Sequence, residues 1–284
     1  MFINGLKFRY VNYACYEIIL PNGKVIVVDP CIDMGPMPGE KAHIAPDFKK
    51  EEFTGADYII LSHTHADHTL EVSYLAKKYN SKIIVGAMSA LALAEAYDLN
   101  TDQVYPCFPN EKFIMEDFTI EVFRGKHTFN RRGPTLGERL KNPASFEKTP
   151  AEQLANIYGS MEYCDFMITT KENVRIFICG GQPQRFYFTN ADEIVKEKAP
   201  NIVIRQSSSK YTPEEFGRHM DQFGPQLVLP LHQDGLARSP IGDLTPQGWF
   251  DKANAELERI GSQTRILNPV PARWYTVGMS ITEE

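Results

Sequence analysis

Short apolar runs separated by turn residues fill the first part of the chain. The segment EIILPNGKVIVVDP, residues 17–30, predicts two strands joined by a Pro-Asn-Gly turn. DYIILS at 57–62 and KIIVG at 82–86 predict two further buried strands. LEVSYLAKKYN at 70–80 and SALALAEAYDL at 89–99 carry apolar residues at helical spacing. Strands and helices therefore alternate from the start.

The rest of the chain continues this pattern with more strands than helices. Further strands are predicted in the segments KFIMEDFTIEVFRG, EYCDFMITT, NVRIFICGG, RFYFTN, NIVIRQ, QLVLPLH and ARWYTVGMSI. Helix starts are predicted where an N-cap residue occurs, at Ser89, Thr149, Thr212 and Thr245. Residues 130–160 break the pattern because they are polar and rich in proline and glycine, with one short helix from Thr149.

Helices that separate groups of strands favour an α+β protein with two packed sheets and helices outside, a four-layer αββα sandwich. The 284 residues are enough to bury a sizeable core. We expect a single domain over residues 1–284, with a lid-like insertion at about 130–160 that lies over the core.

Composition narrows the function further. The chain has 30 basic and 36 acidic residues, a net charge of −6, which argues against a broad nucleic-acid surface. The five cysteines form no CxxC, and the N-terminus lacks a secretory pattern, so we expect reduced thiols and a cytoplasmic protein. No apolar run approaches the roughly 20 residues that span a bilayer, so no membrane partner is expected.

The segment LSHTHADHTL, residues 61–70, concentrates the candidate chemistry. It holds three of the seven histidines, His63, His65 and His68, together with Asp67. Imidazoles and a carboxylate are ligands that divalent ions accept, zinc above all, with manganese and iron as alternatives. Four candidate ligands suit two neighbouring ions, which can hold a hydroxide and clamp a substrate oxygen. An exposed polar loop is the alternative, but HxHxDH directly after a strand favours metal binding.

SHTHADH resembles the HxHxDH signature of the metallo-β-lactamase superfamily of hydrolases. Other landmarks of that superfamily occur in order: Asp29 in VIVVDP, His127 in RGKHT and His232 in LPLH. The resemblance covers about residues 13–234. Within the superfamily, the segment NYACYEIILPNGKVIVVDP is most similar to the ascorbate-6-phosphate lactonase-like branch.

The resemblance implies a set of site residues. His63, His65 and His127 would bind the first ion, and the second ion would be held by Asp67, His68 and His232. Asp29 would brace the metal loop, and Asp67 would also exchange a proton with the leaving group while a metal-bound hydroxide attacks. A homo-oligomer is an expectation from the superfamily alone.

The chain departs from the superfamily after the strand NVRIFIC. Gly181 follows Gly180 where the superfamily carries an aspartate that bridges both ions. Three interpretations stay open. In the first, the second site is weak and the enzyme binds one ion rather than two. In the second, the missing ligand is replaced by Gln182, Asp234 or Cys179. In the third, the protein binds metal without catalysis.

Several other residues have two possible roles. Arg131 and Arg132 follow His127 and can bind a substrate carboxylate or phosphate, or form a solvated loop. Ser207, Ser208, Ser209 and Lys210 can hold an anion or simply lead into the next helix. Tyr158, Tyr163 and Phe166 line a pocket or pack in the core. His43 and His219 match no motif, and we expect His219 on the surface.

These patterns together predict a metal-dependent hydrolase of a small, anionic molecule such as a lactone, an ester or a phosphoester. A nuclease of the same superfamily is one alternative, disfavoured by the acidic net charge. A non-catalytic metal-binding protein is the other, favoured by Gly181. The expected partner is a small-molecule substrate rather than a nucleic acid.

Overall fold

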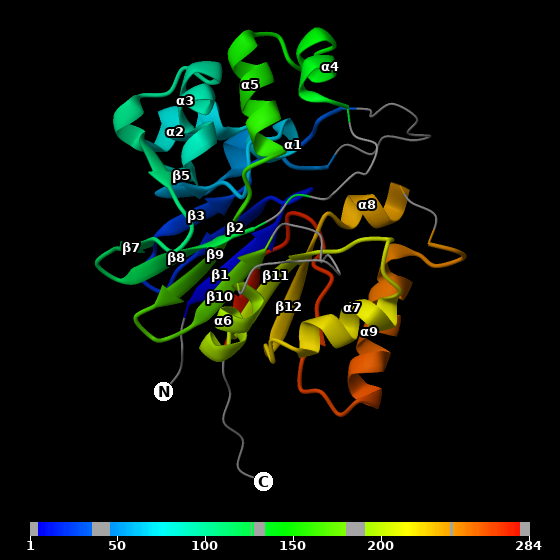
Figure 1. Ribbon diagram of the computed structural model, residues 1–284. Coiled ribbons are helices and arrows are strands. Elements are labelled where there is room, and N and C mark those ends of the chain that lie inside the picture. Colours follow the sequence, from blue (N-terminus) through cyan, green and yellow to red (C-terminus); the bar gives the residue numbers. More distant parts are fainter. Residues whose placement is uncertain are drawn as a thin grey trace.

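The computed structural model describes residues 5–35, 46–125, 127, 134–179, 191–238 and 241–278. Within these residues the strands form two seven-stranded sheets (Figure 1). The strands of the first sheet are, in order, β14 (Tyr275–Val277), β1 (Leu6–Tyr10), β2 (Tyr16–Ile19), β3 (Val25–Val28), β4 (Tyr58–Ile60), β5 (Lys82–Gly86) and β6 (Val104–Cys107). Those of the second are β13 (Arg265–Ile266), β12 (Leu227–Leu231), β11 (Ile202–Gln206), β10 (Arg175–Cys179), β9 (Cys164–Thr170), β8 (Phe118–Arg124) and β7 (Lys112–Ile114).

Each sheet has an antiparallel half and a parallel half. In the first sheet β14, β1, β2 and β3 pair antiparallel, and β3 to β6 pair parallel. In the second sheet β7 to β10 pair antiparallel, and β10 to β13 pair parallel. Parallel strands bring their carboxyl ends to one edge of a sheet, where loops can place functional side chains on a rigid support.

Three apolar clusters define the layers. One lies between the sheets and includes Tyr16, Ile26 and Phe166. A second joins the first sheet to α2 (Val72–Tyr79) and α3 (Ala87–Ala96), and a third joins the second sheet to α7 (Pro213–Asp221) and α9 (Pro246–Arg259). Figure 1 shows α2 and α3 on the opposite side of the sheets from α7 and α9, which confirms the αββα prediction. Among the described helices, none combines the length and the apolar composition that crossing a membrane requires.

Most helix ends lie where the sequence predicts them. The side chains of Thr149, Thr212 and Thr245 each accept a backbone N–H in the first turn of the following helix, as predicted. Helix α2 ends at Tyr79, and Asn80 follows with a φ of 52°, a left-handed conformation that asparagine tolerates.

The predicted N-cap at Ser89 is wrong. Helix α3 begins at Ala87 after Gly86, and Ser89 is buried inside it. The carboxylate of Glu162 accepts the N–H of Met88 at 3.0 Å and of Ser89 at 2.9 Å. A residue distant in sequence therefore caps this helix, which local patterns cannot indicate.

The segment 130–160 holds more structure than predicted. Two helices occur there rather than one, α4 (Leu136–Lys141) and α5 (Pro150–Gly159). Helix α5 packs against α3 and buries Ala155 and Ile157, so its inner face belongs to the folded body. The predicted strand RFYFTN lies outside the described residues. Sequence patterns missed β1, β6, β13 and the short helices α1 (Ala66–Thr69), α6 (Ala191–Lys198) and α8 (Gln233–Arg238).

Candidate metal centre

Loops from both sheets meet beyond the carboxyl ends of β4 and β12. The N–H of Cys164, at the start of β9, donates to the carbonyl of Ser62 at 2.8 Å. The N–H of His232 donates to the carbonyl of Tyr13 at 2.7 Å. Backbone hydrogen bonds therefore fix the loop after β4 and the loop after β12 to the opposite sheet.

The first group of candidate ligands is His63, His65 and His127, with one ring nitrogen of each within 4.8 Å of the others. The ring centroids of His63 and His65 lie 4.5 Å apart, and both rings lie within 5 Å of His127 (4.9 and 4.6 Å). The Nε2 atom of His63 is buried and has no hydrogen-bond partner among the described residues. A buried polar atom without a partner is costly, and a metal ion facing it would satisfy it.

The second group is Asp67, His68 and His232, whose ligand atoms also lie within 4.8 Å of one another. The Nε2 atoms of His68 and His232 are 3.3 Å apart, and His68 Nε2 is 3.6 Å from an oxygen of Asp67. The ring of His68 lies 4.0 Å from the ring of His63, so the two groups are neighbours. Both donor sets suit a borderline divalent ion such as zinc.

Asp29 and Ser62 orient two of these imidazoles. Asp29 is fully buried and accepts three hydrogen bonds, from the Ser62 N–H at 2.7 Å, the Ser62 hydroxyl at 2.6 Å and His68 Nδ1 at 2.9 Å. Ser62 Oγ, having given its proton to Asp29, accepts from His63 Nδ1 at 3.1 Å. Both histidines therefore carry their proton on Nδ1 and present Nε2 to the centre, the arrangement in which a carboxylate supports a metal-binding histidine.

His232 follows β12 with a strained backbone. Its φ is 52°, which is uncommon for a residue with a side chain. The ring centroids of His232 and His68 lie 5.2 Å apart, and His232 Nδ1 lies 3.5 Å from an oxygen of Asp234. Asp234 therefore lies behind His232, and it belongs to neither ligand group among the described residues.

Charge and burial favour the metal-binding protonation states of His63, His65 and Asp67, but not that of His68. Burial lowers the pKa of His63, and neighbouring imidazoles lower it further. The pKa of His65 falls to about 3, for the same two reasons. Burial alone would raise the pKa of Asp67, but the imidazoles around it outweigh burial and lower that pKa to about 2. Burial opposes protonation of His68, yet the carboxylates of Asp67 and Asp29 raise its pKa.

Several predicted residues lie outside the described part of the chain: His43, Arg131, Arg132, Gly180, Gly181 and Gln182. Cys179 is buried with its Sγ 3.0 Å from the Arg205 guanidinium, and it belongs to neither ligand group. The missing bridging aspartate is therefore not replaced by Cys179. The prediction that His219 lies on the surface holds only in part, since its side chain is half-buried, Arg205 contacts it at 3.3 Å and burial lowers its pKa to about 3.

The remaining candidates divide between site and core. The ring of Tyr163 stacks on His63 at 4.7 Å, so it forms a wall of the centre. Phe166 is fully buried between the sheets. The Ser207 hydroxyl donates to the Leu231 carbonyl, and Ser208 accepts from the Lys210 N–H, so this loop uses its polar groups internally. Sequence reasoning missed Ser62, although its position directly before the HxHxDH motif is a usable signal.

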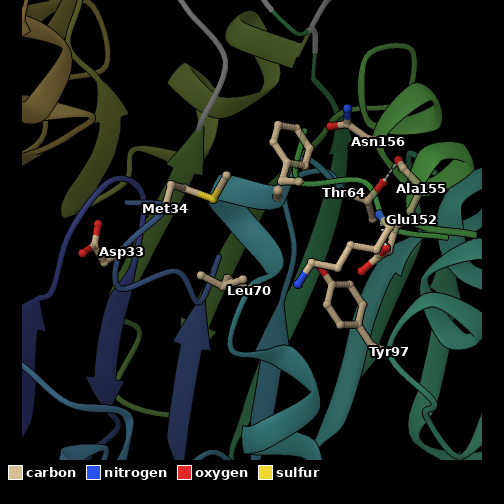
Figure 2. A pocket seen from close by; sticks show the side chains of 11 residues that line it. Asp33, Met34, Thr64, Leu70, Tyr97, Glu152, Ala155 and Asn156 are labelled. Carbon is tan, nitrogen blue, oxygen red and sulfur yellow. Dashed lines mark hydrogen bonds between the residues drawn. The ribbon is translucent and has the colours of Figure 1, made fainter. Parts of the chain in front are cut away.

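A cavity of about 190 Å³ lies beside the metal-binding loop. It is lined by Thr64 and Ala66 from the loop and by residues of α5. Figure 2 shows Thr64 and Ala155 on one side, joined by their hydrogen bond, with Leu70 and Met34 on the other. A small molecule of a few heavy atoms fits this volume, and none of the six candidate ligands lines it.

Comparisons with known proteins agree with this geometry. A profile of the Beta-lactamase superfamily domain matches residues 24–147. A UPF0173 metal-dependent hydrolase of Aeropyrum pernix is 23% identical over 267 residues, 93% of this chain and 95% of the relative. Another, of Desulfitobacterium hafniense, is 27% identical, and that match spans 57% of this chain and 56% of the relative. The structure of Igni18, a metallo hydrolase from Ignicoccus hospitalis, gives a TM-score of 0.65 at 14% identity over 98% of this chain and 99% of that one.

The structural match and the profile match narrow the class of this protein. The chain has the metallo-β-lactamase fold, and residues 24–147 are similar to the Beta-lactamase superfamily domain. With the UPF0173 homologues and the two ligand groups, these findings support a metal-dependent hydrolase of the metallo-β-lactamase superfamily. The ascorbate-6-phosphate lactonase-like branch stays a prediction, as do the metal and the substrate.

Proposed function

We propose that this protein hydrolyses a small, anionic lactone, ester or phosphoester with two divalent ions. The observation that carries the proposal is the pair of neighbouring ligand groups, His63, His65 and His127 beside Asp67, His68 and His232. One such group alone would also suit a structural ion. Two neighbouring ligand groups suit hydrolysis, because a pair of bound ions can activate water and polarise the bond that is broken.

The protein's own residues set up this chemistry. Only a neutral imidazole can bind an ion, because a proton would otherwise occupy the ring nitrogen. The lowered pKa values of His63 and His65 keep both imidazoles neutral at physiological pH. Asp29 fixes His68 directly, and Ser62 fixes His63. The rings are therefore oriented before an ion arrives, which reduces the ordering needed on binding.

Asp67 is the candidate for proton transfer. Its pKa of about 2 keeps the carboxylate ionised at neutral pH, and its side chain is about one-third exposed. An ionised carboxylate at the mouth of the centre can accept a proton during attack and return it to the leaving group. The same residue would bind the second ion through an oxygen.

The class of substrate rests on charge and volume. Arg131 and Arg132 follow His127 in the sequence and are suited to a carboxylate or phosphate. Lys148 lines the cavity beside the metal-binding loop, but Asp33 and Glu152 line it too. The two arginines therefore carry the expectation of an anionic group, and the cavity volume supports a small molecule.

The test is a hydrolysis assay on protein loaded with zinc or manganese, with a panel of lactones, aryl esters and phosphodiesters. We expect turnover that a chelator abolishes and added metal restores. His63→Ala and His232→Ala should each lower kcat/KM at least 100-fold, while His219→Gln, outside both groups, should keep it within about threefold. Fully loaded protein without turnover on any member of the panel, or full activity in the two alanine variants, would refute the proposal.

A further inference from the structure

Helix α5 touches the metal-binding loop at its last turn. The Nε2 atom of His65 lies 2.8 Å from the hydroxyl of Ser160, the C-cap residue of α5. That hydroxyl donates its single proton to the carbonyl of Asn156 at 3.4 Å. With its own proton directed to that carbonyl, Ser160 Oγ would accept the proton of His65 Nε2 at 2.8 Å. His65 would then keep a free lone pair on Nδ1, the nitrogen next to the backbone.

This arrangement differs from that of the other two histidines in the motif. His63 and His68 carry their proton on Nδ1 and present Nε2. His65 would present the opposite nitrogen, and it has neither the Asp29 nor the Ser62 contact that fixes its neighbours. Ser160, from a distant part of the chain, supplies its missing partner.

The contact with α5 depends on close backbone approach. A Cβ at Gly159 would lie 2.9 Å from the backbone N of His65 and 2.9 Å from the backbone C of Thr64, so only glycine fits without displacement. The Thr64 hydroxyl donates to the Ala155 carbonyl at 2.6 Å, one turn earlier. The helix thus contacts the loop at both Thr64 and His65.

Helix α5 is itself held firmly. A capping box at Thr149 and Glu152 begins it, and its buried face packs against α3. After the helix ends, Glu162 caps α3 through two backbone N–H groups. The position of Ser160 is therefore set by the fold rather than by the loop that it contacts.

We propose that Ser160 is a positioning residue that selects the tautomer of His65 and so sets metal affinity at the first ligand group. The inference rests on the proposed metal centre. Partners that orient metal-binding histidines typically change metal affinity by about 10- to 100-fold when they are removed. The segment 130–160 would then have a direct part in metal binding, beyond covering the site.

The experiment compares Ser160→Ala with Ser160→Thr, which keeps the hydroxyl, and with Ser73→Ala as control. Ser73 donates to the Tyr97 carbonyl from α2 and does not contact His65. Two quantities are measured: the dissociation constant for zinc alone, by competition with a chromophoric chelator, and the ¹⁵N chemical shifts of the His65 ring in metal-free protein. We expect Ser160→Ala to weaken the first site about 10- to 100-fold and to lose the Nε2–H tautomer. Ser160→Thr and the control should stay within about threefold of wild type.

Two results would overturn the inference. One is an unchanged zinc affinity in Ser160→Ala, and the other is a wild-type His65 that carries its proton on Nδ1. A lowered melting temperature with an unchanged tautomer would show a purely structural role, which also overturns it. If the wild type binds zinc as described but hydrolyses nothing, the proposed function fails while this inference stands.

Discussion

Replacing Asp29 by asparagine removes the charge on which three hydrogen bonds converge. The carboxylate accepts from the Ser62 N–H, the Ser62 hydroxyl and His68 Nδ1, at 2.7, 2.6 and 2.9 Å. An amide has one acceptor end and one donor end, so in either orientation an N–H of the introduced amide would face another donor. The backbone tolerates the change, because Asp29 has a φ of 44° and asparagine is at ease in that region.

The expected size of the effect follows from these contacts. Each hydrogen bond to a charged group contributes about 1.5–3 kcal/mol. Asp29→Asn removes at least one of the three bonds and weakens the others. The free energy of unfolding of the metal-free protein should therefore fall by about 3 kcal/mol. His68 also loses the carboxylate that holds its proton on Nδ1. We expect affinity for the second ion to fall about 10- to 100-fold, equivalent to about 1.4–2.7 kcal/mol.

Urea unfolding of metal-free protein and a zinc competition titration measure the two effects. Asp98→Asn is the matched control, because Asp98 also has a positive φ (49°) but is exposed. Among the described ion pairs, its carboxylate contacts only Lys77. The control should match wild type in both assays. If Asp29→Asn binds two zinc ions with affinities within threefold of wild type, Asp29 does not orient the centre and the reasoning is wrong.

Two further predictions concern buried groups away from the ligands. Burial raises the pKa of Glu71 to about 7 from an ordinary value of 4.5, although the Ile32 N–H donates to it at 2.9 Å. The folded protein therefore holds this proton more tightly than the unfolded chain, and stability is lost as pH rises from about 4.5 to about 7. In metal-free protein, Glu71→Gln should remove up to about 3 kcal/mol of this pH dependence of the free energy of unfolding. The exposed control Glu51→Gln should leave it unchanged. If the free energy of unfolding changes with pH equally in wild type and Glu71→Gln between pH 4.5 and 8, the prediction is wrong. The Tyr16 hydroxyl donates to the Pro230 carbonyl at 2.8 Å and joins the two sheets. Tyr16→Phe should lower the free energy of unfolding by about 1–2 kcal/mol in urea titrations with little change in m-value, and an unchanged midpoint would show that this bond contributes nothing.

The sequence predicted the layers and the ligands of the metal-binding loop because both depend on local patterns. A short apolar run followed by HxHxDH places His63, His65, Asp67 and His68 at a strand end whatever the rest of the fold, whereas Asp29, His127 and His232 were predicted only from the resemblance to the superfamily. The structure brings His127 and His232, distant in sequence, to the same edge. That these residues bind metal stays a prediction until ions are measured.

What the sequence could not predict depends on contacts between distant segments. Glu162 caps α3, and Ser160 meets His65, because α5 packs on α3. His219 was expected on the surface because its sequence neighbours are polar, yet it is half-buried and contacts Arg205 of β11. In each case a tertiary contact decides the role of a residue whose own surroundings in sequence are uninformative.

Metal stoichiometry tests the central claim most directly. The protein would be purified without chelator, dialysed against zinc and analysed by elemental mass spectrometry, with His63→Ala and His68→Ala beside it. Two neighbouring ligand groups predict about two ions per chain in the wild type and about one in each variant. One ion or fewer in the wild type, or two ions in either variant, would contradict a centre built from these six residues.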